Sequence, residues 1–411
     1  MKWPEYPLAD IVECFLSGGT PSTKIPEYWI GDIPWITGAD IVDGEVILGR
    51  RFINKESIES SATNIVPKGS LLMVTRTGVG KIAIAPIDIA ISQDFTGIIL
   101  KKVIDSKFAL AAIKFRMPIL LAVQRGATIK GVTRSDVENL TIPLPPISEQ
   151  RRIVEILDQA DSLRKKRIEA DAKAVRILPA LFYKMFGDPM TNPKKYPLVT
   201  IGNLVEQIQR RNPSDLPDSI FKYVDISSVD GVSGRIKEYK ALLGSEAPSR
   251  ARQVIETNDV LVSTVRPYLR ATAIVPAELD NEICSTGFCV LRAIEGKGYG
   301  YLYALSRLPW FTELLNSMAR GASYPAVTDN DILDLRVPYP ADNSKVRQFD
   351  DAIFQLIELQ DFRRKSFNML ENLFETILHQ AFLGDLTYKW REAHMKELLT
   401  EMELQVKTLD S

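Results

Sequence analysis

The chain has 411 residues, of which 45% are hydrophobic and 25% are charged. These values are typical of globular proteins and exclude a disordered or collagen-like chain. The length predicts roughly two to four domains. The formal net charge is −1, so a surface that binds nucleic acid would have to be a local feature of the chain.

Neither a membrane span nor a metal site is expected. The most apolar run, residues 108–123, is interrupted by two cations and a proline, and the first residues carry no apolar signal core. Two distant histidines provide no zinc-ligand spacing. We therefore expect a cytoplasmic protein without bound metal, whose three cysteines stay reduced and of which the last two are buried in strands. The cysteines are Cys14, Cys284 and Cys289.

Short motifs recur along the chain at a spacing of about 190 to 197 residues. The sequence therefore predicts two copies of one unit, each a globular segment followed by a long helix. The recurring pairs are Tyr6-Pro7-Leu8 with Tyr196-Pro197-Leu198, Arg125-Gly126-Ala127 with Arg320-Gly321-Ala322, Pro143-Leu144-Pro145 with Pro338-Tyr339-Pro340, and Phe186-Gly187-Asp188 with Phe382-Leu383-Gly384-Asp385.

The segments 149–186 and 345–382 carry apolar residues at three- and four-residue steps, which predicts two long amphipathic helices. Pro179 should kink the first helix or end it at Leu178. We expect the two helices to bury each other as an antiparallel coiled coil; the alternative is that each packs on its own domain. The expected seam is Ile153, Leu157, Ala160, Leu178, Phe349, Ile353, Leu356, Phe367, Leu370, Phe374 and Ile377, with a polar middle at Arg164, Arg167, Asp171, Gln360 and Arg363.

Each globular segment reads as mixed α/β. Strand-like runs at 70–75 and 82–85 are joined by a cationic loop, and the runs at 259–264 and 271–275 repeat this arrangement. One helix per domain is expected, over 108–124 and 299–319. The expected organisation is a first domain at 1–146, a helix at 147–187, a second domain at 188–341, a second helix at 342–385 and a helical tail at 386–411.

No catalytic constellation stands out. The phosphate-binding glycine loop and the nucleophile–histidine–acid set are both missing from the sequence. Asp218, Glu238 and Lys240 imitate the two carboxylates and lysine of a magnesium-dependent nuclease, and this enzyme is kept as an alternative. The sequence favours a non-enzymatic binding protein, and a stand-alone DNA-binding regulator is a further alternative.

Five further motifs stand out along the chain. They are Pro143-Leu144-Pro145-Pro146-Ile147-Ser148-Glu149-Gln150-Arg151-Arg152-Ile153-Val154, Lys184-Met185-Phe186-Gly187-Asp188-Pro189, Ser17-Gly18-Gly19-Thr20-Pro21-Ser22, Ile33-Pro34-Trp35-Ile36, and residues 261–270. With these motifs the chain resembles the DNA-specificity subunit of type I restriction-modification systems, and the resemblance covers nearly the whole chain. The second helix departs from the family pattern, because residues 343–349 replace the usual Glu-Gln opening.

The resemblance implies two target-recognition domains, each reading half of a split sequence in double-stranded DNA, and a helical pair that sets the spacer. It also implies a non-catalytic chain that docks two modification subunits, which methylate adenine, and restriction subunits. S-adenosylmethionine, ATP and Mg²⁺ are then expected on these partners, and no cofactor on this chain.

Loop residues able to bond base edges or phosphates are the candidate DNA contacts. They are Thr20, Lys24, Arg76, Thr77, Lys81, Arg125, Thr128, Lys130 and Arg134 in the first domain, and Arg210, Arg211, Arg266, Tyr268, Arg270, Arg320, Ser323 and Tyr324 in the second. Outward helix faces are candidates for modification-subunit contacts, at Arg151, Arg152, Glu155, Arg164, Lys165, Lys166, Arg167, Arg363, Arg364 and Lys365.

Overall fold

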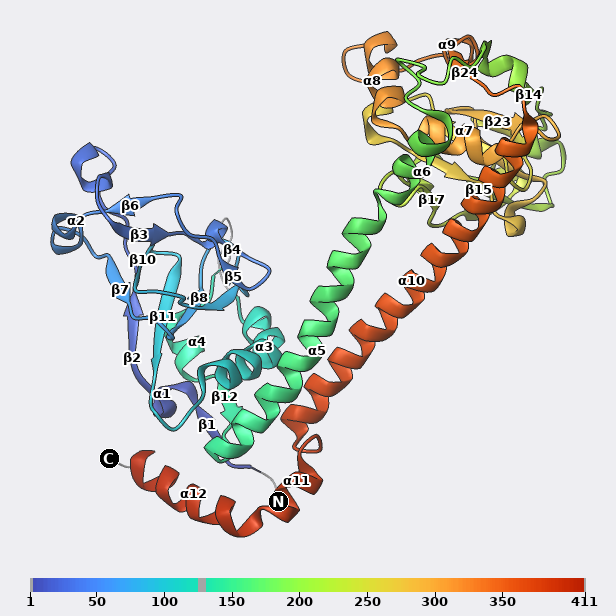
Figure 1. The fold of residues 1–411 in the computed structure, drawn as a ribbon. Helices are drawn as coiled ribbons and strands as arrows, with labels where there is room; N and C mark the ends of the chain where they lie inside the picture. Colours follow the sequence, from blue (N-terminus) through green and yellow to red (C-terminus); the bar gives the residue numbers. More distant parts are fainter. Residues whose placement is uncertain (1–2, 125–130, 410–411) are drawn as a thin grey trace. The chain divides into compact units, whose positions relative to one another are not determined.

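The structure is a computed structural model that describes residues 3–124 and 131–409. The chain divides into two compact units, Met1–Lys165 with Asn368–Ser411 (unit 1) and Lys166–Phe367 (unit 2). Both units combine strands and helices, which confirms the predicted mixed α/β class (Figure 1). The unit boundaries cross the two long helices, so each unit contains part of both helices.

Unit 1 contains two four-stranded sheets, ordered β6-β3-β10-β7 and β2-β11-β8-β9, and the pairs β1-β12 and β4-β5. Its elements are β1 Glu5–Pro7, α1 Leu8–Ile11, β2 Val12–Ser17, η1 Pro26–Trp29, β3 Ile33–Ile36, η2 Gly38–Asp40, β4 Ile41–Val42, β5 Glu45–Val46, β6 Phe52–Ile53, α2 Lys55–Glu59, β7 Asn64–Val66, β8 Leu71–Val74, β9 Ile82–Ile84, β10 Ile89–Ile91, β11 Phe95–Leu100, α3 Ser106–Ala122, α4 Arg134–Glu138 and β12 Thr141–Pro143.

Unit 2 contains the sheets β18-β15-β22-β19 and β14-β23-β20-β21 and the pairs β13-β24 and β16-β17. Its elements are β13 Leu198–Thr200, η3 Ile201–Leu204, β14 Val205–Glu206, η4 Pro213–Asp215, β15 Ile220–Val224, η5 Ile226–Ser228, β16 Val229–Asp230, β17 Arg235–Ile236, β18 Lys240–Leu243, η6 Gly244–Glu246, β19 Ala251–Ile255, β20 Val260–Ser263, η7 Pro267–Leu269, β21 Thr272–Ile274, η8 Ala277–Leu279, β22 Glu282–Ser285, β23 Phe288–Ala293, α7 Tyr299–Ser306, α8 Pro309–Met318, α9 Asp329–Leu333 and β24 Arg336–Pro338.

The two sheet systems have the same strand order, element by element, and this confirms the internal repeat. Each contains one parallel pair in the same place, β3 with β10 and β15 with β22. The predicted strand pairs are also confirmed, because β8 pairs antiparallel with β9 and β20 with β21. The repeat therefore lies in topology, although the globular sequences diverge.

The prediction of a single helix over 299–319 is wrong. The segment forms two helices, α7 and α8, separated at Arg307 and Leu308. Pro309 is the first residue of α8, where its missing N–H costs no hydrogen bond, and its ring disfavours a helical residue before it. In unit 1 the corresponding segment is the single helix α3, which contains Pro118.

The long helices are α5 Ile147–Ala174, its continuation α6 Ile177–Phe186, and α10 Asn343–Leu383. The first helix breaks at residues 175–176, one turn before the expected kink at Pro179. Pro179 lies in the first turn of α6, where a backbone N–H has no helical partner to lose. The proline therefore starts the second segment and does not end the first.

Within each unit the two helix portions run antiparallel. In unit 1 Arg164 donates to both carboxylate oxygens of Glu371, at 2.8 and 2.6 Å, and this contact lowers the pKa of Glu371. In unit 2 Arg363 donates from Nε to Asp171 at 2.9 Å, and Arg167 lies 3.3 Å from the same carboxylate. The seam therefore has the predicted polar middle, and three of the arginines expected on outward faces point into the helix pair.

The apolar seam residues differ in what covers them. The half-buried members are Ala160, Phe367, Leu370, Phe374 and Ile377. The buried members belong to the cores of the globular domains: Ile153 and Leu157 in unit 1, and Leu178, Phe349, Ile353 and Leu356 in unit 2. Both expectations for the helices therefore hold in part, because the helices pair with each other and also pack on the domains.

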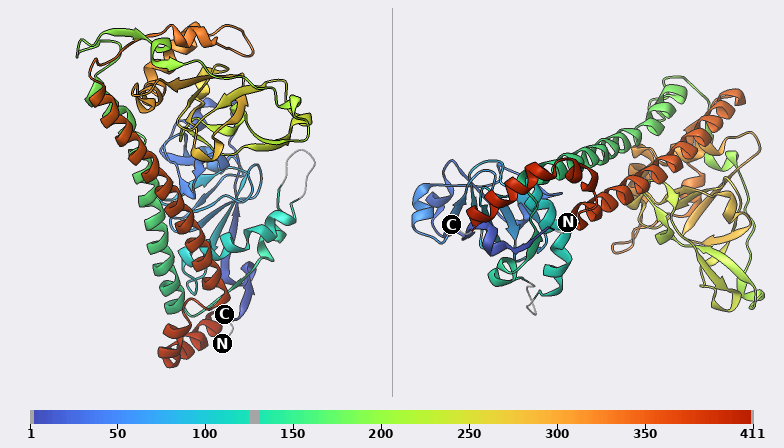
Figure 2. Two further views of the ribbon diagram at one scale, coloured as in Figure 1. Left: turned by 90° about the vertical axis from the view of Figure 1, so that its right-hand side faces the viewer. Right: turned by 90° about the horizontal axis from the view of Figure 1, so that it is seen from below.

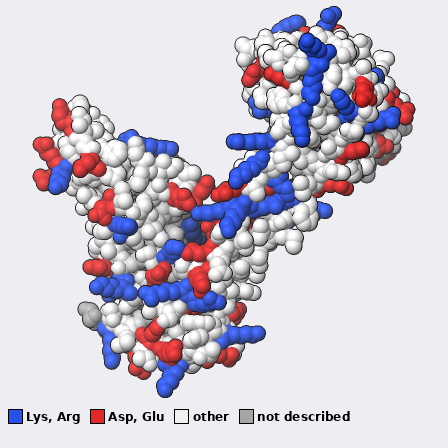
Figure 3. All heavy atoms as spheres, viewed as in Figure 1, with Lys and Arg blue, Asp and Glu red and all other residues white. Residues whose placement is uncertain are grey.

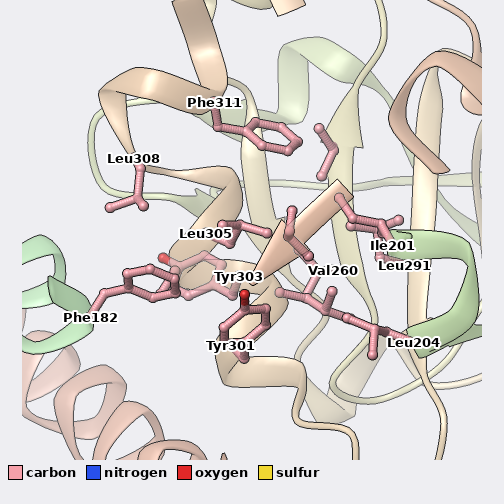
Figure 4. Packing of buried hydrophobic residues seen from close by; sticks show 14 of the residues in the cluster. Phe182, Ile201, Leu204, Val260, Leu291, Tyr301, Tyr303, Leu305, Leu308 and Phe311 are labelled. Atoms are coloured by element: carbon pink, nitrogen blue, oxygen red, sulfur yellow. The ribbon is translucent and has the colours of Figure 1, made fainter. Parts of the chain in front are cut away.

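The main core of unit 2 is built around aromatic side chains (Figure 4). Phe182 and Phe349 contact each other, and each lies 6.0 Å or less from a further ring, including that of the fully buried Tyr301. The Tyr301 hydroxyl donates to the Pro338 carbonyl, and burial raises its pKa. The core thus binds α6 and α10 to the globular domain. Cys284 and Cys289 are buried strand residues, as predicted.

Two further helices, α11 Tyr388–Ala393 and α12 Met395–Leu409, form the last part of unit 1 and lie beside the start of α5 (Figure 2). Glu149 is buried there and accepts hydrogen bonds from Arg391 (2.7 Å), Thr387 (2.6 Å) and the Trp3 indole (3.0 Å). The Arg391 guanidinium also covers the Trp3 ring at 4.7 Å. This buried ion pair joins segments that are more than two hundred residues apart in sequence.

Candidate DNA interface

Two loops of unit 2 meet next to the end of β20. The Arg266 N–H donates to the Pro325 carbonyl at 2.7 Å, and the Val327 N–H donates to the Thr264 carbonyl at 2.9 Å. The bridge between Val265 and Ala326 completes this contact. Residues 264–270 and 320–327, which contain six of the predicted DNA contacts, therefore form one surface, which we call the unit 2 reading loops.

Arg266 occupies an unusual conformation in these loops. Its backbone is left-handed, with φ 51° and ψ 62°, and Arg270 is left-handed as well. Non-glycine residues pay a steric cost there, and such strain is concentrated at functional sites. The Arg266 guanidinium lies 4.5 Å from the Tyr324 ring centre, and that ring is 67% exposed. The loops thus hold a cation and an aromatic face in a fixed arrangement at the surface.

The other predicted contacts of unit 2 fall into two groups. Tyr268, Arg270, Arg320 and Ser323 are exposed on the reading loops, and Arg320 has only a loose contact of 3.7 Å with Asp331. Arg210 and Arg211 lie beside β19, and Arg210 is also near Asp329, which follows the second reading loop. The Arg210 backbone bridges Gln253, and the Arg211 guanidinium donates to the Asn281 carbonyl at 2.6 Å. The structure therefore does not bring these two arginines into the loop surface through any hydrogen bond.

Unit 1 brings equivalent segments together. The Thr75 and Arg76 N–H groups donate to the Asp94 carbonyl at 2.8 and 3.3 Å, and the Val132 N–H donates to the Thr75 carbonyl at 3.0 Å. Thr77 has a positive φ of 34°. Arg76 and Thr77 are exposed at this junction, as are Thr20 and Lys24 in the loop after β2.

Two of the predicted contacts of unit 1 already have partners within the protein. The Lys81 ammonium donates to the carbonyls of Gly38 and Ile41 at 2.9 and 3.0 Å, so it fastens the loop to η2. Arg134 pairs with Glu138 at 2.7 Å. The predicted contacts at Arg125, Thr128 and Lys130 lie outside the described residues.

Sequence reasoning missed two exposed polar residues at these junctions. Gln93 accepts a hydrogen bond from the Thr20 hydroxyl, one residue before the Asp94 carbonyl that holds the unit 1 loop. The Arg250 carbonyl accepts a hydrogen bond from the Thr286 N–H. The next residue, Gly287, accepts at its carbonyl the N–H of Thr264 in the unit 2 reading loops. Gln93 could have been found as an amide between two strands, because amides read adenine. Arg250 had no comparable signal.

Charge is unevenly distributed over the surface, because Lys and Arg gather over parts of the long helices (Figure 3). On the face in Figure 3, acidic and basic side chains are interspersed over the globular part of unit 1. Such an arrangement agrees with a net charge of −1. A nucleic-acid contact must therefore be made by local cations such as those of the loops.

The nuclease alternative finds no structural support. Asp218, Glu238 and Lys240 are exposed, and among the described residues no three His, Cys, Asp or Glu side chains are grouped so that they could hold a metal ion. Within the same part of the chain, no helix combines the length and the apolar character that a membrane crossing requires.

Comparisons with known proteins agree with this arrangement. Residues 1–173 match the family model described as type I restriction modification DNA specificity domain. The MjaIX specificity subunit of Methanocaldococcus jannaschii is 33% identical, with 93% of each chain covered. The EcoR124I/EcoR124II specificity subunit of Escherichia coli is 30% identical over 39% of this chain and 41% of that one.

A solved structure supports the fold over nearly the full length. The S subunit of a type I restriction-modification system from M. genitalium has a TM-score of 0.55 at 16% identity, and the match covers 93% of this chain and 96% of that one. The sequence match and the shared fold together establish that the chain belongs to the specificity subunits of type I restriction-modification systems, the non-catalytic subunits that recognise the DNA target.

Proposed function

We propose that each unit of this specificity subunit reads one half of a bipartite target in double-stranded DNA. The observation that carries this proposal is the repeated junction of two loops, at Arg76 in unit 1 and at Arg266 in unit 2, each presenting a cation beside a fixed backbone. Two readers on one chain suit a target of two half-sites, and a helical pair between them would set the spacer.

The side chains at the junctions suit direct reading of bases. The Arg266 guanidinium is already positioned over the Tyr324 ring, so it loses less freedom when it bonds the O6 and N7 acceptors of guanine, and Gln93 has the amide needed for adenine. Tyr324 offers an apolar face and a hydroxyl beside the arginine. Phosphate contacts from the remaining exposed cations would position the duplex without carrying sequence information.

The family also suggests the partners. Two modification subunits would dock on this chain and methylate adenine, and restriction subunits would complete the complex. Adenine must leave the base stack to be methylated, so a subunit that holds the duplex on both sides would assist that step. S-adenosylmethionine, ATP and Mg²⁺ would then belong to the partner subunits, and no cofactor to this chain.

The test uses Arg76→Ala and Arg266→Ala separately, in the complex with its modification subunit. Loss of a bidentate contact should weaken binding to the target duplex by roughly 10- to 100-fold and relax the sequence preference at one half-site. The two variants should affect opposite halves in a genome-wide map of methylated adenines.

Lys68→Ala and Lys184→Ala serve as matched controls, since both are exposed cations away from the loops, and the methylated motif should stay unchanged. A chain that does not co-purify with a modification subunit, or loop variants that leave the motif unchanged, would contradict the proposal. Failure to co-purify would favour the stand-alone regulator.

A further inference from the structure

The β16–β17 hairpin of unit 2 lies directly against one of the reading loops. A Cβ atom on Gly231 would lie 2.1 Å from the Leu269 carbonyl oxygen, so only glycine permits this approach. Arg307 fastens the hairpin to β21, because its guanidinium donates to the carbonyls of Val232 (2.7 Å) in the hairpin and Thr272 (3.3 Å) in β21. The hairpin and the reading loop are therefore held as one body.

The other side of the same hairpin is fixed to α10. Arg235 forms an ion pair with Asp361 and donates to the Ile357 carbonyl at 2.6 Å. Arg364 and Lys365 follow Asp361 by three and four positions, so they lie on the same helix face, one turn further along α10. Arg364 is 60% exposed and only 3.6 Å from Asp361, and Lys365 is exposed.

These contacts link three segments of unit 2 that each carry cations, and we call this set of cations the basic track. It begins at the reading loop, crosses the hairpin and continues along α10. Asp230 and Asp361 pair with cations of the track, and the exposed Glu238 and Glu358 lie beside it in the sequence. The members of the track are Arg270, Arg235, Lys237, Arg364 and Lys365.

At the equivalent place in unit 1 the hairpin itself is acidic, and the nearby cations, Lys114 and Lys165, belong to α3 and α5. The β4–β5 hairpin carries Asp43 and Glu45, and Glu45 binds Lys165 of α5 at 2.8 Å. In the repeat, Glu45 corresponds to Arg235 and Lys165 corresponds to Asp361. Both units therefore have an ion pair between the hairpin and the long helix, which we call the hairpin latch, and its charges are exchanged between the units. The acidic hairpin of unit 1 would repel phosphate, whereas the hairpin of unit 2 would attract it. The fold itself therefore does not require the basic track.

We propose that the basic track binds the phosphate backbone of the DNA next to the half-site read by unit 2, on the spacer side. This inference rests on the proposed function and adds a contact that carries affinity but no sequence information. A duplex leaving the reading loops along the hairpin would meet Arg235 and Arg364, which Asp361 already holds, on a hairpin that Arg307 fastens. An acidic partner protein is the competing occupant, and the test separates the two.

The test compares the wild-type complex with Arg364→Ala/Lys365→Ala. The probe is a labelled duplex that contains the motif mapped by methylation, titrated at several salt concentrations. Removing two phosphate contacts should lower the slope of log K against log salt by about 1.8, since each contact contributes about 0.9, and should weaken binding about tenfold near physiological salt. The ratio of target to mismatched duplex should stay the same, because phosphates are not read.

Lys396→Ala/Lys407→Ala on α12 is the matched control, with the same change in charge on an exposed helix; it should leave the slope unchanged. A second probe carries uncharged methylphosphonate linkages in the spacer beside the unit 2 half-site. This probe should bind the wild type more weakly than the normal duplex does, whereas the double variant should bind both equally.

Three results would overturn the inference. An unchanged salt slope in the double variant would leave the proposed function intact but remove the track from the interface. A double variant that loses its modification subunit, with DNA affinity per assembled complex unchanged, would assign the track to a protein partner. An equal loss in the α12 control would show a general effect of charge. Failure of the proposed function would look different, because the wild type would not discriminate its target.

Discussion

The hairpins β4–β5 and β16–β17 occupy the same place in the repeat, and they fasten their domains to the following helix with opposite charges. In unit 1 the hairpin provides the acid, Glu45, and the helix provides Lys165; in unit 2 the hairpin provides Arg235 and the helix Asp361. The strand order is identical in the two units. The two units therefore share their backbone architecture, while the polar groups that fasten it differ from unit to unit.

The starts of the long helices differ in the same way. In unit 1 Gln150 accepts the Asp105 N–H at 2.8 Å and donates to the Val103 and Pro145 carbonyls, which fixes α5 to the start of α3. In unit 2 the Asp350 carboxylate accepts the Gly300 N–H at 2.9 Å at the start of α7. A neutral amide and a carboxylate thus serve the same junction, and only the second can titrate.

The largest effect on stability is expected for the buried ion pair of Glu149 with Arg391, which has no counterpart in unit 2. Glu149→Ala should lower the free energy of unfolding by about 3–5 kcal/mol, because it leaves the buried Arg391 without its anion. Chemical denaturation of the full chain measures this. Lys107→Ala is the matched control, since its pair with Asp158 is exposed and contributes at most about 1 kcal/mol. Equal losses in the two variants would contradict the account.

A smaller effect on stability, dependent on pH, is expected from Asp350 at the start of α10. Burial raises the pKa of Asp350 to about 6, assisted by the neighbouring Asp351 and opposed by the Gly300 N–H. Between about pH 4 and 6 the folded chain therefore holds a proton that the unfolded chain has released, so stability falls as pH rises through this window. Because the side chain is partly exposed, the fall should be about 1–2 kcal/mol.

Asp350→Asn tests this pH dependence, because its oxygen can still accept the Gly300 N–H. The variant should lack the fall, so that it becomes more stable than the wild type by about 1–2 kcal/mol at pH 7 and not at pH 4. Thermal denaturation over a pH series measures the difference. Asp334→Asn, an exposed control, should follow the wild type. A difference between Asp350→Asn and the wild type that does not depend on pH would rule out this origin.

The smallest effect is expected at the two hairpin latches. Arg235→Ala should cost about 1 kcal/mol, because the half-buried guanidinium also bonds the Ile357 carbonyl. Glu45→Ala should cost less than about 0.5 kcal/mol, since both groups of its ion pair are exposed. Denaturation of the two variants side by side checks the order. A larger loss for Glu45→Ala would mean that the latches do not differ as their burial indicates.

Much of the fold could be predicted because it depends on local patterns. The apolar spacing of 149–186 and 345–382 predicted the long helices, and the recurring motifs predicted the repeat that the strand order confirms. Prediction failed at two prolines, because a proline breaks a helix interior but is tolerated in the first turn of a helix. Pro179 and Pro309 lie in first turns, so each belongs to the start of a helical segment and does not interrupt one.

The remaining features depend on contacts between distant parts of the chain. The pair of Glu149 with Arg391 spans 242 residues, and no local pattern connects the two. In the same way, composition placed Arg266 among the candidates, but only the fold shows its left-handed backbone and its position over Tyr324. Gln93 was missed because its position becomes apparent only after folding, which brings Thr20 to Gln93 and Arg76 to the adjoining Asp94.

The most direct test of the account is to replace residues 1–146 with the corresponding domain of another specificity subunit and to map methylated adenines in cells that also express the modification subunit. The account predicts that one half of the methylated motif changes, while the other half and the spacer length stay the same. A change in both halves, or in neither, would contradict the claim that each unit reads its own half of the target.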